Sequence, residues 1–158
     1  MAAGRDLSLR GRALKLLSLR EQSRSELMRK LAPHAESPEQ VQALLDDLQR
    51  AGLLSEQRFG ESLVRRRASR YGRRFIEHEL GEHKVAAEVA APLLRELAGD
   101  ERSRALALWR RRFRAPPADL AERARQHRFL AQRGFDGETI AWVLREAART
   151  PPDDPEGG

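Results

Sequence analysis

Arginine dominates the side chains of this sequence that could take part in chemistry. Basic residues number 30 against 24 acidic ones, and only Lys15, Lys30 and Lys84 are lysine. The planar guanidinium group of arginine forms paired hydrogen bonds with phosphate or carboxylate groups. Together with the net charge of +6, this composition predicts an acidic partner, either nucleic acid or an acidic groove on another protein.

The arginines gather in two clusters, which we take as the candidate binding site. The clusters are Arg65, Arg66, Arg67, Arg70, Arg73 and Arg74, and then Arg110, Arg111, Arg112 and Arg114. Both lie near the end of an expected helix, at corresponding places in a repeat, so stacking of the repeats would align them into a basic stripe. A simpler role stays open, because positive charges also complement the negative end of a helix. Tyr71, inside the first cluster, would either contact a partner or pack against the helix end.

The other polar residues do not suggest catalysis. His78 and Glu82 stand one helical turn apart, but no third residue has the spacing of a metal ligand. Asp46 and Asp47 are adjacent, so their side chains would point about 100° apart on a helix and could not act as a pair. The sequence has no cysteine and no glycine-rich phosphate loop. We therefore expect a binding protein that is not an enzyme and that uses no metal or cofactor.

An internal repeat indicates which elements carry the arginines. A trio of apolar residues occurs three times, at intervals of 49 and 50 residues: Leu44, Leu45 and Leu48; Leu93, Leu94 and Leu97; Val143, Leu144 and Ala147. Apolar residues three and four positions apart form one face of a helix. The trio therefore predicts the same buried helix in each of three tandem units.

Capping signals divide each unit further. The segment from Ser23 to Glu26 has the pattern of a capping box, in which serine and glutamate satisfy the first backbone N–H groups of a helix. Further expected N-caps are Ser37, Ser55, Asp100 and Asp136. The glycines expected to end helices are Gly52, Gly72, Gly99 and Gly134. No stretch shows the sustained alternation of a strand.

These signals predict an all-α protein with nine helices, arranged as three tandem three-helix repeats in an elongated, curved array. The expected repeats cover residues 8–54, 55–99 and 100–149, with a flexible N-terminus at 1–7 and a disordered tail at 150–158. Each repeat is small, so we expect neighbouring repeats to share a core. Since no apolar run approaches the ~20 residues of a membrane span and no signal peptide opens the chain, we expect a cytoplasmic protein without membrane contact. Nothing in the pattern demands a dimer, and we expect a monomer.

Several short motifs also occur in a recognisable order. They are Ala13-Leu14-Lys15 with Leu17, Ser23-Arg-Ser-Glu-Leu27, Gly52-Leu53-Leu54 with Arg58-Phe59, and Arg128-Phe-Leu130 with Arg133-Gly-Phe135. In this order, over roughly residues 9–148, the chain resembles the RecX family, the small regulators of the bacterial recombinase RecA. The sequence departs from the family pattern in three places. Ser55-Glu56 stands where the family commonly has an acidic pair, Gly60 where it commonly has alanine, and Lys84 where it usually has glycine. A left-handed lysine at that place would cost about 1 kcal/mol relative to glycine, unless the corner turns differently.

The resemblance implies a protein that lies in the helical groove of the RecA–DNA filament. It implies inhibition of RecA's ATP hydrolysis and strand exchange, and limited filament growth. The family supplies no catalytic residues to carry over. Two alternatives stay open: an independent DNA-binding protein with tandem helix-turn-helix-like modules, and a protein scaffold that ignores nucleic acid.

Overall fold

The structure, a computed structural model, describes residues 6–149, and in this range it contains nine α-helices, one short 3-10 helix and no strand. The helices are α1 (Leu9–Leu19), α2 (Arg24–Leu31), α3 (Pro38–Arg50), α4 (Glu56–Arg67), α5 (Arg73–Glu82), α6 (Ala87–Gly99), α7 (Glu101–Arg112), α8 (Leu120–Gln132) and α9 (Gly137–Arg149), with the 3-10 helix η1 (Ala32–His34) after α2. We call α1–α3 unit one, α4–α6 unit two and α7–α9 unit three. Apart from residues 6 and 7, the expected flexible N-terminus and disordered tail lie outside the described residues.

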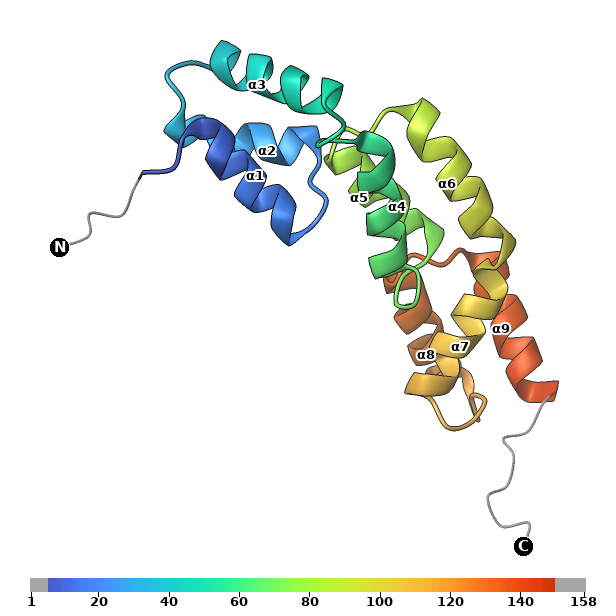
Figure 1. Cartoon of the computed structure of the whole chain (residues 1–158). Coiled ribbons are helices and arrows are strands. Elements are labelled where there is room, and N and C mark those ends of the chain that lie inside the picture. Colours follow the sequence, from blue (N-terminus) through green and yellow to red (C-terminus); the bar gives the residue numbers. More distant parts are fainter. Residues whose placement is uncertain (1–5, 150–158) are drawn as a thin grey trace, which may run out of the picture.

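The three units follow one another along a bow, which confirms the predicted curved, all-α array of three-helix repeats (Figure 1). The third helices of the units, α3, α6 and α9, lie along the outer edge of the bow. Helices α1 and α4 lie on its inner side (Figure 1). The same position in each repeat therefore recurs on the same side of the molecule.

The repeat found in the sequence is a repeat of structure. Helices α3, α6 and α9 each contain 13 residues. Leu45, Leu94 and Leu144 each occupy the eighth position of their helix, and all three are buried. The apolar trio therefore marks the inward face of the third helix in every unit, as predicted.

Most of the expected N-caps form. The side chain of Ser23 accepts a hydrogen bond from the backbone of Glu26 at 3.0 Å, and Glu26 accepts one from the backbone of Ser23 at 2.8 Å, which completes the capping box. Ser37, Ser55 and Asp136 also accept a backbone N–H from the third residue after them. Asp100 does not cap α7, because its side chain accepts no backbone N–H. Its carboxylate pairs instead with an arginine of α7.

The glycines serve two different purposes. Gly52 and Gly134 have positive φ angles of 74° and 94° and end their helices as predicted. Gly99 is the last residue of α6 and so also ends its helix as predicted, although without a positive φ. For Gly72 the prediction is wrong, because it has an extended backbone, with φ −83°, and directly precedes α5. A Cβ atom on Gly72 would lie 2.4 Å from the backbone oxygen of Gly134, so this glycine permits a close contact between two chain segments.

The buried apolar side chains form three separate clusters, one in each unit. Leu27 and Leu45 belong to the cluster of unit one, Phe59 to that of unit two, and Trp109 and Ile140 to that of unit three. The expectation that neighbouring repeats share a core is therefore wrong. In units two and three the third helix packs on both other helices, and in unit one α2 packs on both α1 and α3, so that each unit encloses its own apolar residues. The junctions between units contain several hydrogen bonds and ion pairs.

Candidate nucleic-acid and partner interface

The two predicted arginine clusters lie at the ends of the first helices of units two and three. Arg65, Arg66 and Arg67 form the last turn of α4, and Arg110, Arg111 and Arg112 form the last turn of α7. Arg70 lies in the corner after α4, Arg73 and Arg74 begin α5, and Arg114 follows α7. The exposed members are Arg65, Arg66, Arg70, Arg74, Arg110, Arg111, Arg112 and Arg114, whereas Arg67 and Arg73 are half-buried.

Arg67 is engaged within its own unit. Its guanidinium donates to both carboxylate oxygens of Glu79, at 3.0 and 2.9 Å. This paired hydrogen bond raises the pKa of Arg67 above its ordinary value. The guanidinium carbon also lies 5.8 Å from the centre of the Tyr71 ring. Arg67 therefore ties α4 to α5 and rests on the one tyrosine of the chain.

Arg66 faces other positive charges. Partial burial, followed by the nearby charges of Arg20 and Arg67, lowers the pKa of its guanidinium from the ordinary value. Arg20 belongs to unit one, where it is paired with the buried Glu26 at 2.9 Å. Glu26, paired with Arg20, and Glu79, paired with Arg67, act on this pKa in the opposite direction. Of the three arginines, Arg66 is therefore the one left without a carboxylate partner among the described residues.

The two clusters meet at the junction of units two and three. Arg111 of α7 donates to the backbone oxygen of Ser69, in the corner that follows α4. Arg104, earlier in α7, donates to the backbone oxygens of Ala68 at 2.7 Å and of Tyr71 at 2.8 Å. The end of α4 and the length of α7 are therefore held together by arginine side chains. Arg104 was missed in the sequence because it lies outside both runs of arginine.

Direct backbone contacts strengthen the same junction. The N–H of Gly72 donates to the backbone oxygen of Arg133 at 2.7 Å, and the N–H of Arg74 donates to that of Gly134 at 3.2 Å. Arg73 donates its backbone N–H to the buried carboxylate of Glu101 at 2.8 Å. Burial raises the pKa of Glu101, although the Arg73 N–H and the charge of Arg104 act in the opposite direction. Arg73 and Arg74 therefore help to join the two units and line a small hollow of about 350 Å³ there.

Arginines and aromatic rings alternate across this junction. The guanidinium carbon of Arg133 lies 5.5 Å from the ring centre of Tyr71 and 5.1 Å from that of Phe129. The guanidinium of Arg112 lies 5.7 Å from Phe129 and 5.2 Å from Phe113, and the two phenylalanine rings meet edge to face at 5.4 Å. We call this alternating series the arginine–aromatic ladder. Its members are Arg67, Tyr71, Arg133, Phe129, Arg112, Phe113 and Arg125.

Only part of the ladder was expected from the sequence. Arg67 and Arg112 belong to the predicted clusters, and Tyr71 was noted beside them. Arg125 and Arg133 were not predicted, because each stands alone in the sequence and reaches the ladder only through the fold. For Arg133, its spacing of four residues from Phe129 at the end of α8 is the one signal that could have suggested it. Arg125 lies over Phe113, twelve positions earlier, and had no local signal.

Charge is distributed unevenly between the two sides of the bow. The first helices of the units, α1, α4 and α7, carry twelve basic and three acidic side chains. The third helices, α3, α6 and α9, carry seven acidic and four basic side chains. Because the third helices line the outer edge (Figure 1), the outer edge is acidic and the remainder of the bow is strongly basic.

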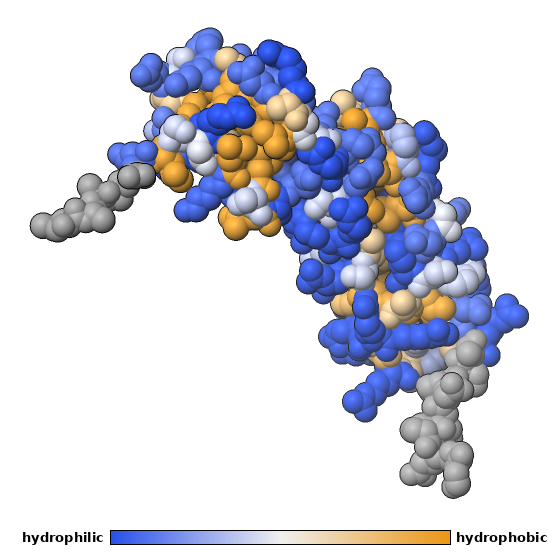
Figure 2. All heavy atoms as spheres, in the orientation of Figure 1, coloured by the Kyte–Doolittle hydropathy of each residue, from blue (hydrophilic) through white to orange (hydrophobic). Residues whose placement is uncertain are grey.

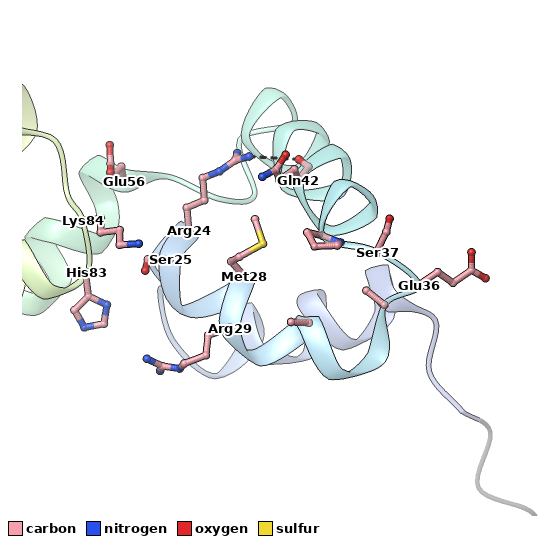
Figure 3. Close-up of a pocket in the computed structure, with 13 residues that line it drawn as sticks. Arg24, Ser25, Met28, Arg29, Glu36, Ser37, Gln42, Glu56, His83 and Lys84 are labelled. Carbon is pink, nitrogen blue, oxygen red and sulfur yellow. Dashed lines mark hydrogen bonds between the residues drawn. The ribbon is translucent and has the colours of Figure 1, made fainter.

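A second hollow, of about 890 Å³, opens between units one and two (Figure 3). Arg24, Met28 and Arg29 line it from α2, and His83 and Lys84 line it from the corner after α5. At its edge the hydroxyl of Ser23 lies 2.8 Å from Nδ1 of His83, a contact that links the two units. The ion pair between Arg58 and Glu21, at 2.9 Å, is a second link.

Unit one also exposes apolar surface. Figure 2 shows a broad apolar area over α1 and α2, whereas units two and three are mostly hydrophilic in the same view. Leu14, Leu16 and Leu17 of α1 are only half-buried against the core of unit one, and Leu19 is 75% exposed. Such surface on a monomer is typical of a contact with another protein.

Other kinds of site find no support between residues 6 and 149. No group of three or more metal-binding side chains occurs in this range. His78 and Glu82 lie 3.5 Å apart, and both are well exposed. In the same part of the chain, no helix combines the length and the apolar character that crossing a membrane requires.

Comparison with known proteins identifies relatives for this arrangement. Residues 55–94 match the family model described as the second three-helix domain of RecX, and residues 100–144 match that of the third three-helix domain. These ranges correspond to most of units two and three.

Full-length relatives carry the same name. The regulatory protein RecX of Leptothrix cholodnii is 52% identical over 93% of this chain and 94% of its own length. The regulatory protein RecX of Ralstonia nicotianae is 50% identical over 89% of each chain. The crystal structure of RecX from Lactobacillus salivarius has the same fold, with a TM-score of 0.73 over 90% of this chain and 96% of that one, at 17% sequence identity.

Proposed function

Because the chain belongs to the RecX family, we propose that it regulates RecA by binding the RecA–DNA filament in its helical groove. Bound there, it inhibits RecA's ATP hydrolysis and strand exchange and limits growth of the filament. It acts wherever the filament forms on chromosomal DNA, which for a bacterium is the cytoplasm. It does so as a regulator and not as an enzyme, and it works as a monomer.

The observation that carries this proposal is the near full-length similarity to proteins named as regulators. The geometry agrees with it. A bow of three like units presents equivalent surfaces at regular intervals, which suits a polymer of identical subunits. Its basic remainder can face acidic protein or DNA phosphate while the acidic outer edge faces away.

The predicted arginine clusters are part of the proposed contact. Arg65, Arg66, Arg70 and Arg110 are exposed and make no ion pair among the described residues, so they remain available to a partner. The side chains of Arg67 and Arg111 are held by Glu79 and Ser69, and the backbone N–H of Arg73 by Glu101, so these three support the surface from within. We propose that the first group contacts the filament and that the second group shapes the contact.

The direct test is the rate of RecA-catalysed ATP hydrolysis on single-stranded DNA, with and without this protein. We expect strong inhibition at a protein concentration well below that of RecA, because a bow of three like units can bridge neighbouring subunits of the filament. Simultaneous replacement of Arg65, Arg66 and Arg70 by alanine should weaken inhibition by about tenfold or more in the concentration required. Absence of inhibition by the unmodified protein at equimolar RecA would count decisively against the proposal.

An independent DNA-binding protein is the rival function, and the arginine–aromatic ladder is the observation that favours it. The two are separated by adding RecA. A filament regulator binds the assembled filament more tightly than bare DNA, whereas an independent DNA-binding protein gains nothing from RecA. A pure protein scaffold would bind equally well without DNA and at high salt, since its contacts would not displace counterions.

A further inference from the structure

We infer that the arginine–aromatic ladder binds the phosphodiester backbone of a nucleic-acid strand directly, through the guanidinium groups of Arg112 and Arg133. This deepens the proposed function, on which it rests for the presence of DNA beside the protein. The contact itself needs no RecA.

The two arginines share one aromatic ring. Arg112 comes from the end of α7 and Arg133 from the corner after α8, yet both guanidinium carbons lie within 6 Å of the centre of Phe129, at 5.7 and 5.1 Å. Their separation cannot exceed the sum of those two distances. Two elements of unit three therefore converge to place two positive charges close to the same ring.

Neither guanidinium is satisfied by the protein. Between residues 6 and 149, the other arginines of the ladder have carboxylate partners: Arg67 pairs with Glu79, and Arg125 pairs with Glu122 at 3.2 Å. No carboxylate lies within ion-pairing distance of Arg112 or Arg133, and neither side chain donates a hydrogen bond within that range. A guanidinium that rests its face on a ring keeps its N–H edge available. These two edges are therefore ready to receive an anion.

The stacking holds the arginines in place before a ligand arrives. A free arginine loses considerable side-chain entropy on binding, and contact with an aromatic ring removes part of that loss in advance. Arg133 lies between Tyr71 and Phe129, and Tyr71 is itself stacked on Phe75 at 3.9 Å. The ladder is thus a rigid support for the charges, which favours affinity.

The series of charges points to a nucleic-acid backbone and not to a single carboxylate. Nucleic acid presents phosphates at a short, fixed interval, and the ladder holds two unpaired guanidinium groups close to one ring. The paired donors of arginine match a phosphate group. The rings are already covered by arginines, so bases have no place to stack on them. Binding should therefore be independent of sequence and sensitive to salt.

The test is the fluorescence anisotropy of a labelled 20-nucleotide oligothymidylate, titrated with the full chain in the absence of RecA. We expect Arg112→Ala and Arg133→Ala each to weaken binding by about tenfold and to lower the salt slope by about one. The matched controls are Arg95→Ala and Arg145→Ala, which remove one exposed charge from α6 and α9 on the outer edge. These controls should change affinity by less than about twofold.

Two further variants separate direct contact from other effects. Arg133→Lys keeps the positive charge but loses the planar fork, and we expect it to bind clearly more weakly than the unmodified chain. Phe129→Leu keeps both arginines but removes their support, so it should weaken binding while leaving the salt slope unchanged. Thermal unfolding of each variant confirms that it is folded at the temperature of the titration.

Several results would overturn the inference. One is the absence of oligonucleotide binding by the unmodified chain, and another is equal weakening by the ladder and control variants. A third is unchanged affinity of the Arg133→Lys variant, which would mean that the positive charge alone, and not the planar guanidinium, explains the binding. Ladder variants that bind DNA normally but no longer inhibit RecA would make the ladder a protein contact. Conversely, DNA binding through the ladder without any inhibition of RecA would sustain this inference and remove the proposed function.

Discussion

Lys84 has a left-handed backbone conformation, with φ 57°, in the corner between α5 and α6. Gly134 takes the same place in unit three, with φ 94°. The hydrogen bonds of the two corners correspond: the residue after each donates to the backbone oxygen five residues before it, Leu80 or Leu130. The turn is therefore kept although the residue is not glycine, and the strain anticipated from the sequence is present.

Replacing this lysine tests the strain. Lys84→Gly should raise the free energy of unfolding by about 1 kcal/mol, because glycine adopts positive φ without a clash of its Cβ atom. Lys84→Ala removes the same charge but keeps Cβ, and it should give no such gain. Chemical denaturation of the three proteins measures the difference. A glycine variant no more stable than the alanine variant would show that the corner is unstrained.

The carboxyl group of Glu26, in α2, has a strongly lowered pKa. Burial alone would raise its pKa, but hydrogen bonds from Arg20 and from the backbone of Ser23, with the charges of Arg20 and Lys30, lower it to about 2. A carboxyl whose folded pKa lies below its unfolded value stabilises the fold above the unfolded pKa. That stability is lost as the pH falls from about 4.5 towards 2.

Unit one should accordingly be sensitive to acid. The shift corresponds to roughly 3 kcal/mol of stability at neutral pH. Glu26→Gln should lose most of it at pH 7 and should show a flatter stability profile between pH 4.5 and 2 than the unmodified chain. Glu39→Gln, an exposed change in the first turn of α3, is the control and should follow the unmodified profile. Parallel acid profiles for all three proteins would refute this role of Glu26.

The sequence predicted some residue roles better than others. Capping residues are local, so Ser23 and Glu26 could be paired from spacing alone. The roles of Arg67, Arg104 and Arg111 depend on carboxylates and backbone oxygens that lie 12 to 42 positions away in the sequence. No local pattern indicates which of several adjacent arginines a distant partner will engage. For this reason the predicted clusters contain both supporting and available side chains.

At the scale of elements, units two and three are joined by close contact between two glycines. A Cβ atom on Gly72 would lie 2.4 Å from the oxygen of Gly134, and one on Gly134 would lie 2.6 Å from the backbone nitrogen of Phe75. Both distances are far shorter than a real Cβ contact allows. The helices were predictable from apolar periodicity, but this contact was not, because it depends on how two complete units meet.

Substituting these glycines should open the junction. Gly134→Ala combines a clash with a positive φ, and we expect it to lower the free energy of unfolding by about 2–4 kcal/mol. Gly81→Ala is the matched control, since no atom lies within 4 Å of its added Cβ and alanine favours the helix. The control should be neutral or slightly stabilising by thermal unfolding. A Gly134→Ala protein as stable as the control would contradict the contact.

At the scale of the whole molecule, separate cores imply separate local stabilities. Leu45 is completely buried in unit one, and Leu45→Ala should cost about 2–5 kcal/mol there. Hydrogen exchange followed along the chain should accelerate in α1–α3 and remain unchanged in α7–α9. Uniform acceleration over all nine helices of the described range would instead mean that the three units unfold together.

The curved array itself was predicted from a repeat of three apolar residues, because a fixed interval of buried residues requires a fixed unit of structure. The separation of the three cores was not predicted, since periodicity shows that one face of a helix is buried but not which other helices cover that face. Separate cores joined by polar contacts suit a protein that follows the groove of a polymer. On the proposed function, the basic remainder of the bow would face the DNA and the acidic outer edge would face away from it.

The most direct test of this account is co-sedimentation of the chain with RecA filaments assembled on single-stranded DNA, compared with RecA alone and with bare DNA. At physiological salt, we predict that the chain pellets with the filaments at concentrations where it remains largely in solution with either component alone. Equal recovery with bare DNA and with filaments, or no recovery with filaments, would contradict the claim that the assembled filament is its target.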